Sequence, residues 1–347
     1  MTEIIRIGMD TSKSVFQLHG VDAAERVVLR KKLRRQDVLV FFAKLPPCRV
    51  GMEACGGSHY WARELQKLGH RVELIPPQYV KPYVLRGKHD AADAEAICEA
   101  LSRPHLQRRL VPVKSAENQA ALMLAGLRDR LVRQRTQLIN TIRGYAAEFG
   151  LVAAKGPAKI AALLRRIEGE AAVPEPAQAL FAGLAEEHAR LEAQIKAIEA
   201  RLMAWHRQDE LSRRLAQIPS IGPIGACFLV LKAPDPQRFR SGRDFAAWIG
   251  LTPKNHTTAG KQRLGVITRA GDETLRSVLV VGATSVIRQV RRGTSRSAPP
   301  WLLALLARKP PKLAAVALAN KVARIAWKLM VTGERYDPSR LAAEPAN

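Results

Sequence analysis

Four acidic residues within the first hundred positions have the types and the spacing that metal-dependent phosphoryl chemistry requires. Asp10 and Glu53 each end an apolar run typical of a β-strand, and Asp90 and Asp93 begin an alanine-rich helical segment. Residues three apart share one face of a helix, so the last two carboxylates can point at one spot. Two Mg²⁺ ions held about 3.5–4 Å apart by shared carboxylates are a common device for attacking phosphodiesters. We therefore predict an Mg²⁺ site, with two ions expected.

Each of these acids has a simpler explanation when it is taken alone. An Asp at the end of a strand is common, and an acidic pair in the first turn of a helix is favoured by the helix dipole without any ligand. Their order along the chain is more specific. An Asp that ends the first strand, a Glu that ends a later strand and an acidic pair on a following helix resemble the layout of a ribonuclease H-like domain.

The chain carries a large positive charge over its 347 residues. It contains 56 Lys and Arg against 31 Asp and Glu, which gives a formal net charge of +25. This excess is larger than solubility requires, and it indicates a polyanionic partner, nucleic acid before an anionic membrane. Aromatic residues make up only 5% of the chain. Contacts to the phosphate backbone should therefore outweigh the stacking of unpaired bases on aromatic side chains.

An α/β pattern over residues 1–114 supplies the elements that must position the acids. Open α/β sheets place their sites at the carboxyl ends of strands, which is where Asp10 and Glu53 fall. The pattern predicts a mixed sheet covered by helices. The expected strands lie at 4–9, 15–20, 26–33, 48–53 and 71–75, with a helix at 58–69.

Residues 115–210 have the periodicity of two long helices. Near-heptad positions on the first are Leu127, Leu131, Leu138 and Tyr145. The second has a 4-3-4-3 repeat at Leu184, His188, Leu191, Ile195, Ile198, Leu202 and Trp205. This periodicity predicts a coiled coil, formed either within the chain or between chains, with His188 as a packed polar residue. Arg128 and Arg135 on the first helix are candidate nucleic-acid contacts.

Residues 211–294 form a further predicted unit, mainly helical. The segment IPSIGPIGA predicts a helix-hairpin-helix, in which Gly222 and Gly225 leave backbone N–H groups at a helix N-terminus for a phosphate oxygen. A purely structural turn between helices is the alternative. A basic loop follows at 250–265. Its Lys254, Lys261 and Arg263 are further candidate nucleic-acid contacts.

Residues 295–347 are expected to form a basic helical tail. Its apolar stretch at 313–330 is interrupted by Lys321, Arg324 and Lys328, which predicts an amphipathic helix and no membrane span. The four cysteines match neither a zinc pattern nor a disulfide framework, so we expect reduced thiols within the core or on strands. We expect no signal peptide. We expect a cytoplasmic, nucleoid-associated protein without a membrane partner.

Motifs in both halves of the chain resemble one known family. In the N-terminal half they are GMDTSK, MEACGGSHYWA around Glu53, and RGKHDAADAEAI around Asp90 and Asp93. In the C-terminal half they are IPSIGPIGA, FAAWIGLTPK and AGKQRLGVITRAGDETLRSVLVVGA. Together they are similar to the bacterial DEDD transposases of the insertion sequence 110 type, relatives of the Piv DNA invertase. The resemblance extends from about residue 4 to 290.

The resemblance implies an architecture and an activity. The architecture is a RuvC-like N-terminal domain, a coiled-coil insertion and a C-terminal transposase domain. The activity is that of a recombinase that mobilises its own element, with an element-encoded guide RNA that pairs with donor and target DNA. A homo-oligomer, a dimer or a tetramer, is expected, in which domains of different subunits meet. Asp10, Glu53, Asp90 and Asp93 would hold Mg²⁺, and a hydroxyl of the C-terminal domain would attack the phosphodiester.

The attacking hydroxyl is where this chain departs from the family pattern. Relatives have a serine before a glycine and a basic residue, whereas residues 257–261 read TTAGK. A threonine also offers a hydroxyl nucleophile, although its β-branch stiffens χ1 and crowds the oxygen. Counted from Pro253, Thr258 falls at the serine position of some relatives and Thr257 at that of others. We expect Thr258 to be the nucleophile, with Thr257 as the alternative.

Two other functions fit the same residues. The first is a RuvC-like Holliday-junction nuclease, in which water attacks and no covalent protein–DNA adduct forms. The second is an inactive nucleic-acid-binding remnant of a transposase. The missing serine favours the remnant, and the complete acidic set opposes it.

Overall fold

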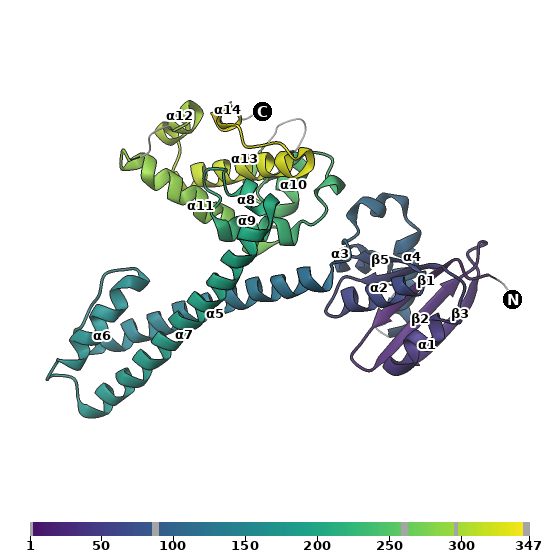
Figure 1. Cartoon of the computed structure of the whole chain (residues 1–347), viewed down its shortest axis with the longest axis horizontal. Coiled ribbons are helices and arrows are strands. Elements are labelled where there is room, and N and C mark those ends of the chain that lie inside the picture. Colours follow the sequence, from purple (N-terminus) through teal and green to yellow (C-terminus); the bar gives the residue numbers. More distant parts are fainter. Residues whose placement is uncertain (1–2, 85–89, 258–262, 295–297, 343–347) are drawn as a thin grey trace. The chain divides into compact units, whose positions relative to one another are not determined.

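The computed structural model describes residues 3–84, 90–257, 263–294 and 298–342 (Figure 1), without the side chains of Asp90 and Arg108. The chain forms two compact units. One consists of Met1–Gln119 with Gln237–Phe239, and the other of Ala120–Pro236 with Arg240–Asn347. The four-part division expected from the sequence stays a prediction.

A five-stranded mixed sheet is the centre of the N-terminal unit, with the strand order β3-β2-β1-β4-β5. The first three strands are antiparallel, whereas β1, β4 and β5 run parallel to one another. Every strand expected from the sequence is present, with its ends shifted by at most two residues. The strands are β1 (Arg6–Thr11), β2 (Val15–Val21), β3 (Val27–Arg34), β4 (Arg49–Glu53) and β5 (Arg71–Ile75).

Helices cover both faces of this sheet. The helix α4 (Asp90–Ser102) packs along β1, β2 and β4. On the opposite face, α1 (Val38–Phe42) and α2 (Ser58–Lys67) enclose a core that includes Phe16, Phe42 and Trp61. A smaller cluster joins α4 to α3 (Pro77–Val80) through Ile75, Val80 and Ile97. The sheet with helices on both faces is the α/β arrangement predicted from the sequence.

Three helices of the C-terminal unit share one core. They are α5 (Ala116–Glu148), α6 (Ile160–Glu168) and α7 (Glu175–Gln208). The pairing is therefore within the chain. The buried face of α7 includes Leu191, Ile195, Ile198 and Leu202, as the repeat predicted. The supercoil itself stays a prediction.

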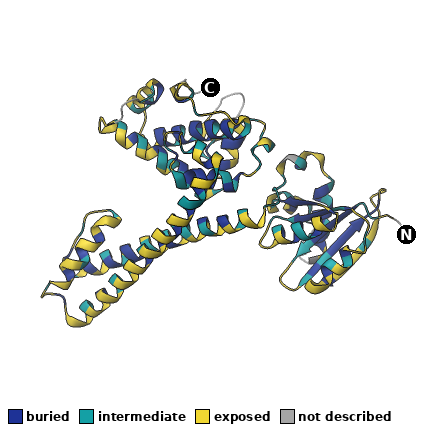
Figure 2. Ribbon diagram, in the orientation of Figure 1, coloured by how far each residue is buried: buried dark blue, intermediate teal, exposed yellow. Residues whose placement is uncertain are grey.

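The buried face of α5 agrees only in part with the predicted one, since Leu131 and Leu138 are buried as expected. Leu127 and Tyr145 are exposed by 42% and 46%, whereas Ile139, Ile142 and Ala146 are buried. Buried and exposed residues both occur along the length of this helix (Figure 2). The physical reason is that α5 shares its core with two helices, so its apolar stripe is wider than the seam of a two-stranded coil.

The remaining helices pack around α13 (Pro311–Thr332). Ala319, Val322 and Ala323 are fully buried on α13, which contacts α10, α11 and α12. The predicted helix is present, but its amphipathic character is not. Lys321 is only 6% exposed, and residues 314–327 are all buried or half-buried, because other helices surround α13. The expected tail thus contains a central helix of the unit. Within the described residues, no helix combines the length and the apolar character needed to span a membrane. The other helices are α8 (Glu210–Leu215), α9 (Pro223–Lys232), α10 (Gly242–Ile249), α11 (Glu273–Arg291), α12 (Pro300–Arg308) and α14 (Pro338–Ala342).

Candidate active site

The register of two parallel strands brings Asp10 and Glu53 together. Met9 of β1 pairs with Met52 of β4, so the next residue of each strand is the acid. Side chains alternate between the faces of a sheet, and Met9 and Met52 lie in the core beneath α1 and α2. Asp10 and Glu53 therefore point to the opposite face, which α4 covers. Both are partly exposed.

Two glycines allow α4 to lie directly on this face. A Cβ atom on Gly8 would stand 2.1 Å from the carbonyl oxygen of Ala94 and 2.4 Å from the backbone nitrogen of Cys98. A Cβ atom on Gly51 would stand 3.0 Å from a methyl carbon of Leu101. Each glycine precedes its acid by two residues, so glycine and acid share one face of the strand. The sequence analysis missed this role, although a glycine two positions before each strand-terminal acid is a visible signal.

The direction of α4 places its N-terminal turn beside the two acids. Arg6, at the start of β1, donates from Nε to the carbonyl oxygen of Cys98 at 3.0 Å, and Arg49, at the start of β4, donates to that of Leu101 at 3.3 Å. The C-terminal half of α4 therefore lies at the opposite end of these strands from the acids. The first turn, which contains Asp93, lies at their carboxyl ends. The positive end of the helix dipole also favours negative charge there.

The electrostatics of Glu53 show that three of the four predicted acids lie near one another. Burial raises the pKa of the Glu53 carboxyl, and the negative charges of Asp10 and Asp93 raise it further. Asp90 begins α4, but its side chain lies outside the described residues. Like charges in one place destabilise one another unless a cation or a proton neutralises them.

The donor chemistry of this site fits a hard divalent cation. The predicted ligands Asp10, Glu53 and Asp93 offer only carboxylate oxygens, which Mg²⁺ prefers. In the described part of the chain, no three Asp, Glu, His or Cys side chains stand together closely enough to hold a metal ion. Since Mg²⁺ is bound through few carboxylates with water and substrate phosphate completing its shell, such a sparse set is compatible with it.

Two neutral side chains connect the strands just beyond the acids. The hydroxyl of Thr11 and the thiol of Cys55 lie 3.4 Å apart. All four cysteines are free, as expected, but Cys55 is exposed and does not belong to the core. Cys55 is in the turn that leads from β4 into α2, so its side chain lies on the rim of the site.

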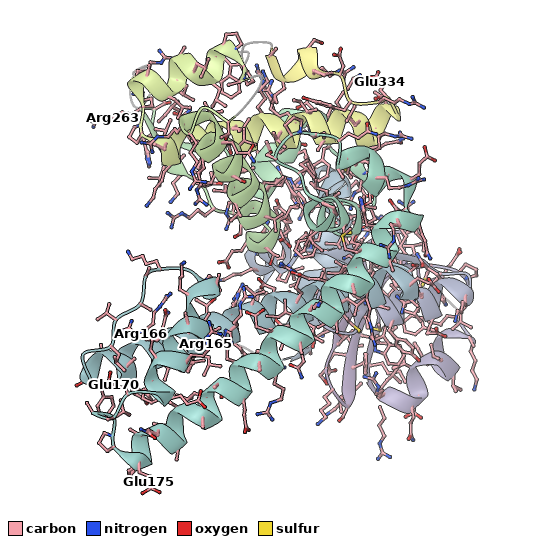
Figure 3. The ribbon with its side chains drawn as sticks, turned by 60° about the vertical axis from the view of Figure 1, so that its left-hand side comes forward. Arg165, Arg166, Glu170, Glu175, Arg263 and Glu334 are labelled. Carbon is pink, nitrogen blue, oxygen red and sulfur yellow. The ribbon has the colours of Figure 1, made fainter. Side chains whose placement is uncertain are left out.

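The predicted basic loop is a β-hairpin. Strand β6 (Pro253–Asn255) pairs antiparallel with β7 (Leu264–Ile267), and the backbone N–H of His256 donates to the carbonyl oxygen of Arg263 at 2.8 Å. Lys254 and Arg263 are both exposed on this hairpin. Figure 3 labels Arg263.

Of the two candidate nucleophiles, Thr257 belongs to the described residues and Thr258 does not. Thr257 is exposed, and its hydroxyl donates to the side-chain oxygen of Asn255 at 2.5 Å. Thr258 and Lys261 lie outside the described residues. In the described part of the chain, the hydroxyl of Thr257 is thus bonded to an amide, which cannot act as a base.

Gly222 and Gly225 occupy different environments at the start of α9. Gly222 is exposed at the N-cap, and a Cβ atom there would meet no atom within 4 Å. Gly225 is buried, and a Cβ atom there would lie 3.0 Å from a methyl carbon of Val278 in α11. The packing against α11 explains Gly225 as a structural residue, which was the alternative to phosphate binding. The helix-hairpin-helix function stays a prediction for Gly222.

Arg128 and Arg135 have carboxylate partners within the helical core region. Arg128 pairs with Glu199 and Arg135 with Glu192, in both cases from α5 to α7. Their side chains are only 25% and 19% exposed. Because each guanidinium is already paired across the two helices, the binding proposals below do not rely on them.

Comparisons with known proteins agree with this geometry. Residues 7–149 match the DEDD transposase family of the IS110 type, and residues 212–298 match the Transposase IS116/IS110/IS902 family. A Sinorhizobium fredii protein designated y4pF/y4sB is 65% identical over 96% of this chain and 86% of its own length. The transposases for the insertion sequence elements IS1328 of Yersinia enterocolitica and IS1111A of Coxiella burnetii are each 38% identical, over 96% and 97% of this chain and 98% and 92% of their own lengths.

The family matches and the relatives agree with each other and cover both halves of the chain. The N-terminal match contains Asp10, Glu53 and Asp93, the three acids whose charges interact. The C-terminal match contains the hairpin with the candidate hydroxyls. The chain therefore belongs to the IS110 family of insertion-sequence transposases.

Proposed function

We propose that this transposase cleaves and exchanges DNA strands at the ends of its own insertion sequence, guided by an element-encoded RNA. The observation that supports the site most is the strand register, in which Met9 pairs with Met52 and the next residue of each strand is an acid, Asp10 or Glu53. The pKa of Glu53, raised by burial and then by the charges of Asp10 and Asp93, agrees with this register. Asp10 and Glu53 end two parallel strands, and Asp93 lies in the first turn of the helix that packs on them. This is the position at which an open α/β sheet holds its functional groups.

We infer that Asp10, Glu53, Asp90 and Asp93 bind Mg²⁺, with two ions expected. When bound, Mg²⁺ supplies polarisation of the scissile phosphodiester and stabilises the oxygens that gain negative charge. The carboxylates fix the position of this charge because Gly8 and Gly51 hold α4 against the sheet. The close packing of β1, β4 and α4 keeps the acids in place as a preorganised set.

We propose that a hydroxyl of the C-terminal hairpin attacks the phosphodiester. Thr258 is the preferred residue and Thr257 the alternative. Attack would join the threonine oxygen to phosphorus and release the 3′ or 5′ oxygen of the cleaved strand, which takes up a proton. The exposed side chains of Lys254 and Arg263, together with Lys261, would hold the phosphate by charge-assisted hydrogen bonds.

The partners that we propose follow from charge and from the family. A net charge of +25 suits DNA, donor and target, and a guide RNA, through neutralisation of phosphates. Gly222 is a further candidate phosphate contact, since it is exposed at the start of α9. A homo-oligomer would unite the two domains from different subunits. A cytoplasmic, nucleoid-associated location suits these partners.

A nuclease that uses water is the second candidate function. The observation that favours it is that residues 253–263 contain no serine. In such a nuclease the acids would act alone, and no adduct would form. Detection of a covalent protein–DNA species would distinguish the proposed transposase from a nuclease that uses water.

The Asp10→Ala variant tests the proposed function. We expect it to lose strand cleavage and exchange while it keeps nucleic-acid binding, because it removes one carboxylate and no basic residue. Asp37→Ala is the matched control, since Asp37 is exposed and lies outside the site. Cleavage should be assayed with donor and target DNA, Mg²⁺ and RNA from the element. Full activity of Asp10→Ala, or of the parent chain in excess chelator, would overturn the proposal.

A further inference from the structure

The edge strand β3 carries a row of basic side chains on one face of the sheet. Arg30, Lys32 and Arg34 alternate along the strand, so all three point to the same side, and all three are exposed. The other face of β3 is different. There Leu33 is buried, and Lys31 lies over the ring of Phe41 at 4.8 Å from its centroid.

The strand register shows that this basic row faces the same way as the carboxylates. Asp10 of β1 pairs with Gln17 of β2, and Gln17 pairs with Lys32 of β3. Residues directly opposite on neighbouring strands project to the same face. Lys32 is therefore level with Asp10 and two strands away, which is roughly 10 Å at the usual strand spacing.

The two end residues of the basic row, Arg30 and Arg34, lie on either side of the level of Asp10 along the strands. Arg30 pairs with His19, which pairs with Gly8, so Arg30 is level with the contact between β1 and α4. Arg34 pairs with Val15 and lies beyond the level of Asp10, at the open end of the sheet. Successive members of the row are about 6.8 Å apart along the strand. The row thus runs beside α4 and past the carboxylate site.

No carboxylate holds the side chains of this row directly in the described part of the unit. The charge of Glu95 of α4 acts on the same surroundings, since it interacts with His19 beside Arg30. Within the described part of the chain, none of the three forms an ion pair, and β3 contains no acidic residue. Three nearby arginines, in contrast, form ion pairs. Arg6 pairs with Glu25, Arg26 with Asp22, and Arg49 with Glu73 at 3.0 Å.

Protection of an edge strand against aggregation is the simpler explanation of charge on β3. Edge strands use lysine and other charged residues for this purpose, and a single inward or exposed charge is often enough. This explanation does not account for three cations on the face of the acids and on a strand without any anion. It also predicts a different outcome when the charges are removed.

We propose that Arg30, Lys32 and Arg34 form a binding site for the phosphodiester backbone of the nucleic-acid strand that enters the carboxylate site. This inference rests on the proposed function, because it gives the acids their substrate strand. Contacts on consecutive phosphates fix the register of a strand without reading its bases. The basic row therefore determines which phosphate lies beside Asp10.

The test removes the three charges and keeps the size of the side chains. The variant Arg30→Gln, Lys32→Gln, Arg34→Gln is compared with a control that removes three exposed charges from α6 and α7, Arg165→Gln, Arg166→Gln, Arg190→Gln. Figure 3 labels Arg165 and Arg166. Binding of the full chain to labelled single-stranded DNA, duplex DNA and RNA is measured without Mg²⁺ between low and moderate salt. Circular dichroism and size-exclusion chromatography verify the fold and the assembly state.

We expect the basic-row variant to lose about 2 from the slope of log affinity against log salt for a single strand, and the control to keep the parental slope. A loss on the DNA arms supports the proposal, because DNA is the substrate strand of the proposed function. A loss on the RNA arm alone would assign the basic row to the guide RNA and would overturn the proposal. An unchanged slope on all arms, an equal loss in the control, or aggregation with parental binding would overturn it.

Cleavage mapping gives a readout that distinguishes this inference from the proposed function. We expect the basic-row variant, at saturating protein concentration, to cut at displaced or several neighbouring phosphates. Asp10→Ala should not cut at all. If Asp10→Ala cuts normally, the proposed function fails, whereas the salt slopes still decide whether the basic row binds a strand.

Discussion

The two regions that carry the proposed chemistry are built in different ways. The carboxylate site of the N-terminal unit lies on a five-stranded sheet, and α4 touches the backbone of β1 at Gly8. The hydroxyl-bearing hairpin of the C-terminal unit has only β6 and β7, in which the described residues are mostly exposed. The first region has its own core, and the second is a surface extension.

The two regions therefore differ in how they hold their functional groups in position. Groups that must hold a cation need fixed mutual positions, which strand register and close helix packing provide. A two-stranded hairpin is only marginally stable by itself, so its position depends on what it contacts. We infer that the acids are preorganised in the free chain, whereas the hydroxyl is positioned when nucleic acid binds.

The largest expected effect is the loss of the covalent adduct when the hydroxyls are removed. Valine is nearly isosteric with threonine but has no hydroxyl, so the double variant Thr257→Val, Thr258→Val should form no protein–DNA adduct. Thr258→Ser should keep or raise the yield, because it removes only the methyl group that crowds the oxygen. Denaturing gel electrophoresis with labelled DNA measures the adduct. Parental strand exchange by the double variant would mean that the nucleophile is water or another residue.

Gly8→Ala should disrupt the carboxylate site, because it disturbs the packing of α4 on β1. The added methyl group would stand 2.1 Å from the carbonyl oxygen of Ala94, so α4 must move away from β1. We expect a fall of about 1–3 kcal/mol in the free energy of unfolding, or more, together with a loss of cleavage. Gly56→Ala is the control, since a Cβ atom there meets nothing within 4 Å. Equal denaturant midpoints for the two variants would contradict the role given to Gly8.

His59, in α2 behind the carboxylate site, should make the N-terminal unit sensitive to acid. Burial, and then the charges of Lys114 and Arg63, lower the pKa of His59 from its ordinary value of 6.5 to about 4. Between these values the unfolded chain binds the proton and the folded chain does not. Stability should therefore fall as the pH falls from 6.5 toward 4.

The variant His59→Gln should lose less stability than the parent chain over this pH window. Its amide oxygen can still accept the hydrogen bond that His59 Nδ1 receives from the backbone N–H of Lys114 at 3.2 Å. Chemical denaturation at pH 7 and pH 5 measures the difference. The same pH dependence in both proteins would assign the acid sensitivity to other groups.

The smallest effect should come from the hairpin. Val266 of β7 is 69% exposed, so Val266→Thr should change the free energy of unfolding by less than about 0.5 kcal/mol. Thermal unfolding measures it. A large destabilisation would show that the free chain buries this face of the hairpin, and the contrast between the two regions would then be weaker.

Much of the N-terminal unit could be predicted from its sequence. Strands of alternating or continuous apolar character, such as those that end at Asp10 and Glu53, have a local signal that periodicity detects. The order of the acids predicted their convergence, which the raised pKa of Glu53 supports. The close approach of α4 to Gly8 was not predicted, because it depends on residues about 90 positions apart.

The helical regions were harder to predict from sequence. A heptad pattern identified the buried face of α7, but the buried face of α5 depends on a third helix that the pattern does not contain. The charges of Arg128 and Arg135 suggested a nucleic-acid surface, whereas Glu199 and Glu192 on another helix pair with them. An ion pair between residues that are far apart in the chain gives no local pattern by which a single sequence could predict it.

The most direct test of the carboxylate site is the binding of a divalent cation to the purified chain. Mn²⁺, which can replace Mg²⁺ and is visible by electron paramagnetic resonance, should be titrated into the parent chain and into Glu53→Gln. Glutamine keeps the size of the side chain but removes the charge that Asp10 and Asp93 oppose. We predict saturable Mn²⁺ binding by the parent chain and its loss, or a weakening of at least tenfold, in Glu53→Gln. Identical stoichiometry and affinity in the two proteins would contradict the account.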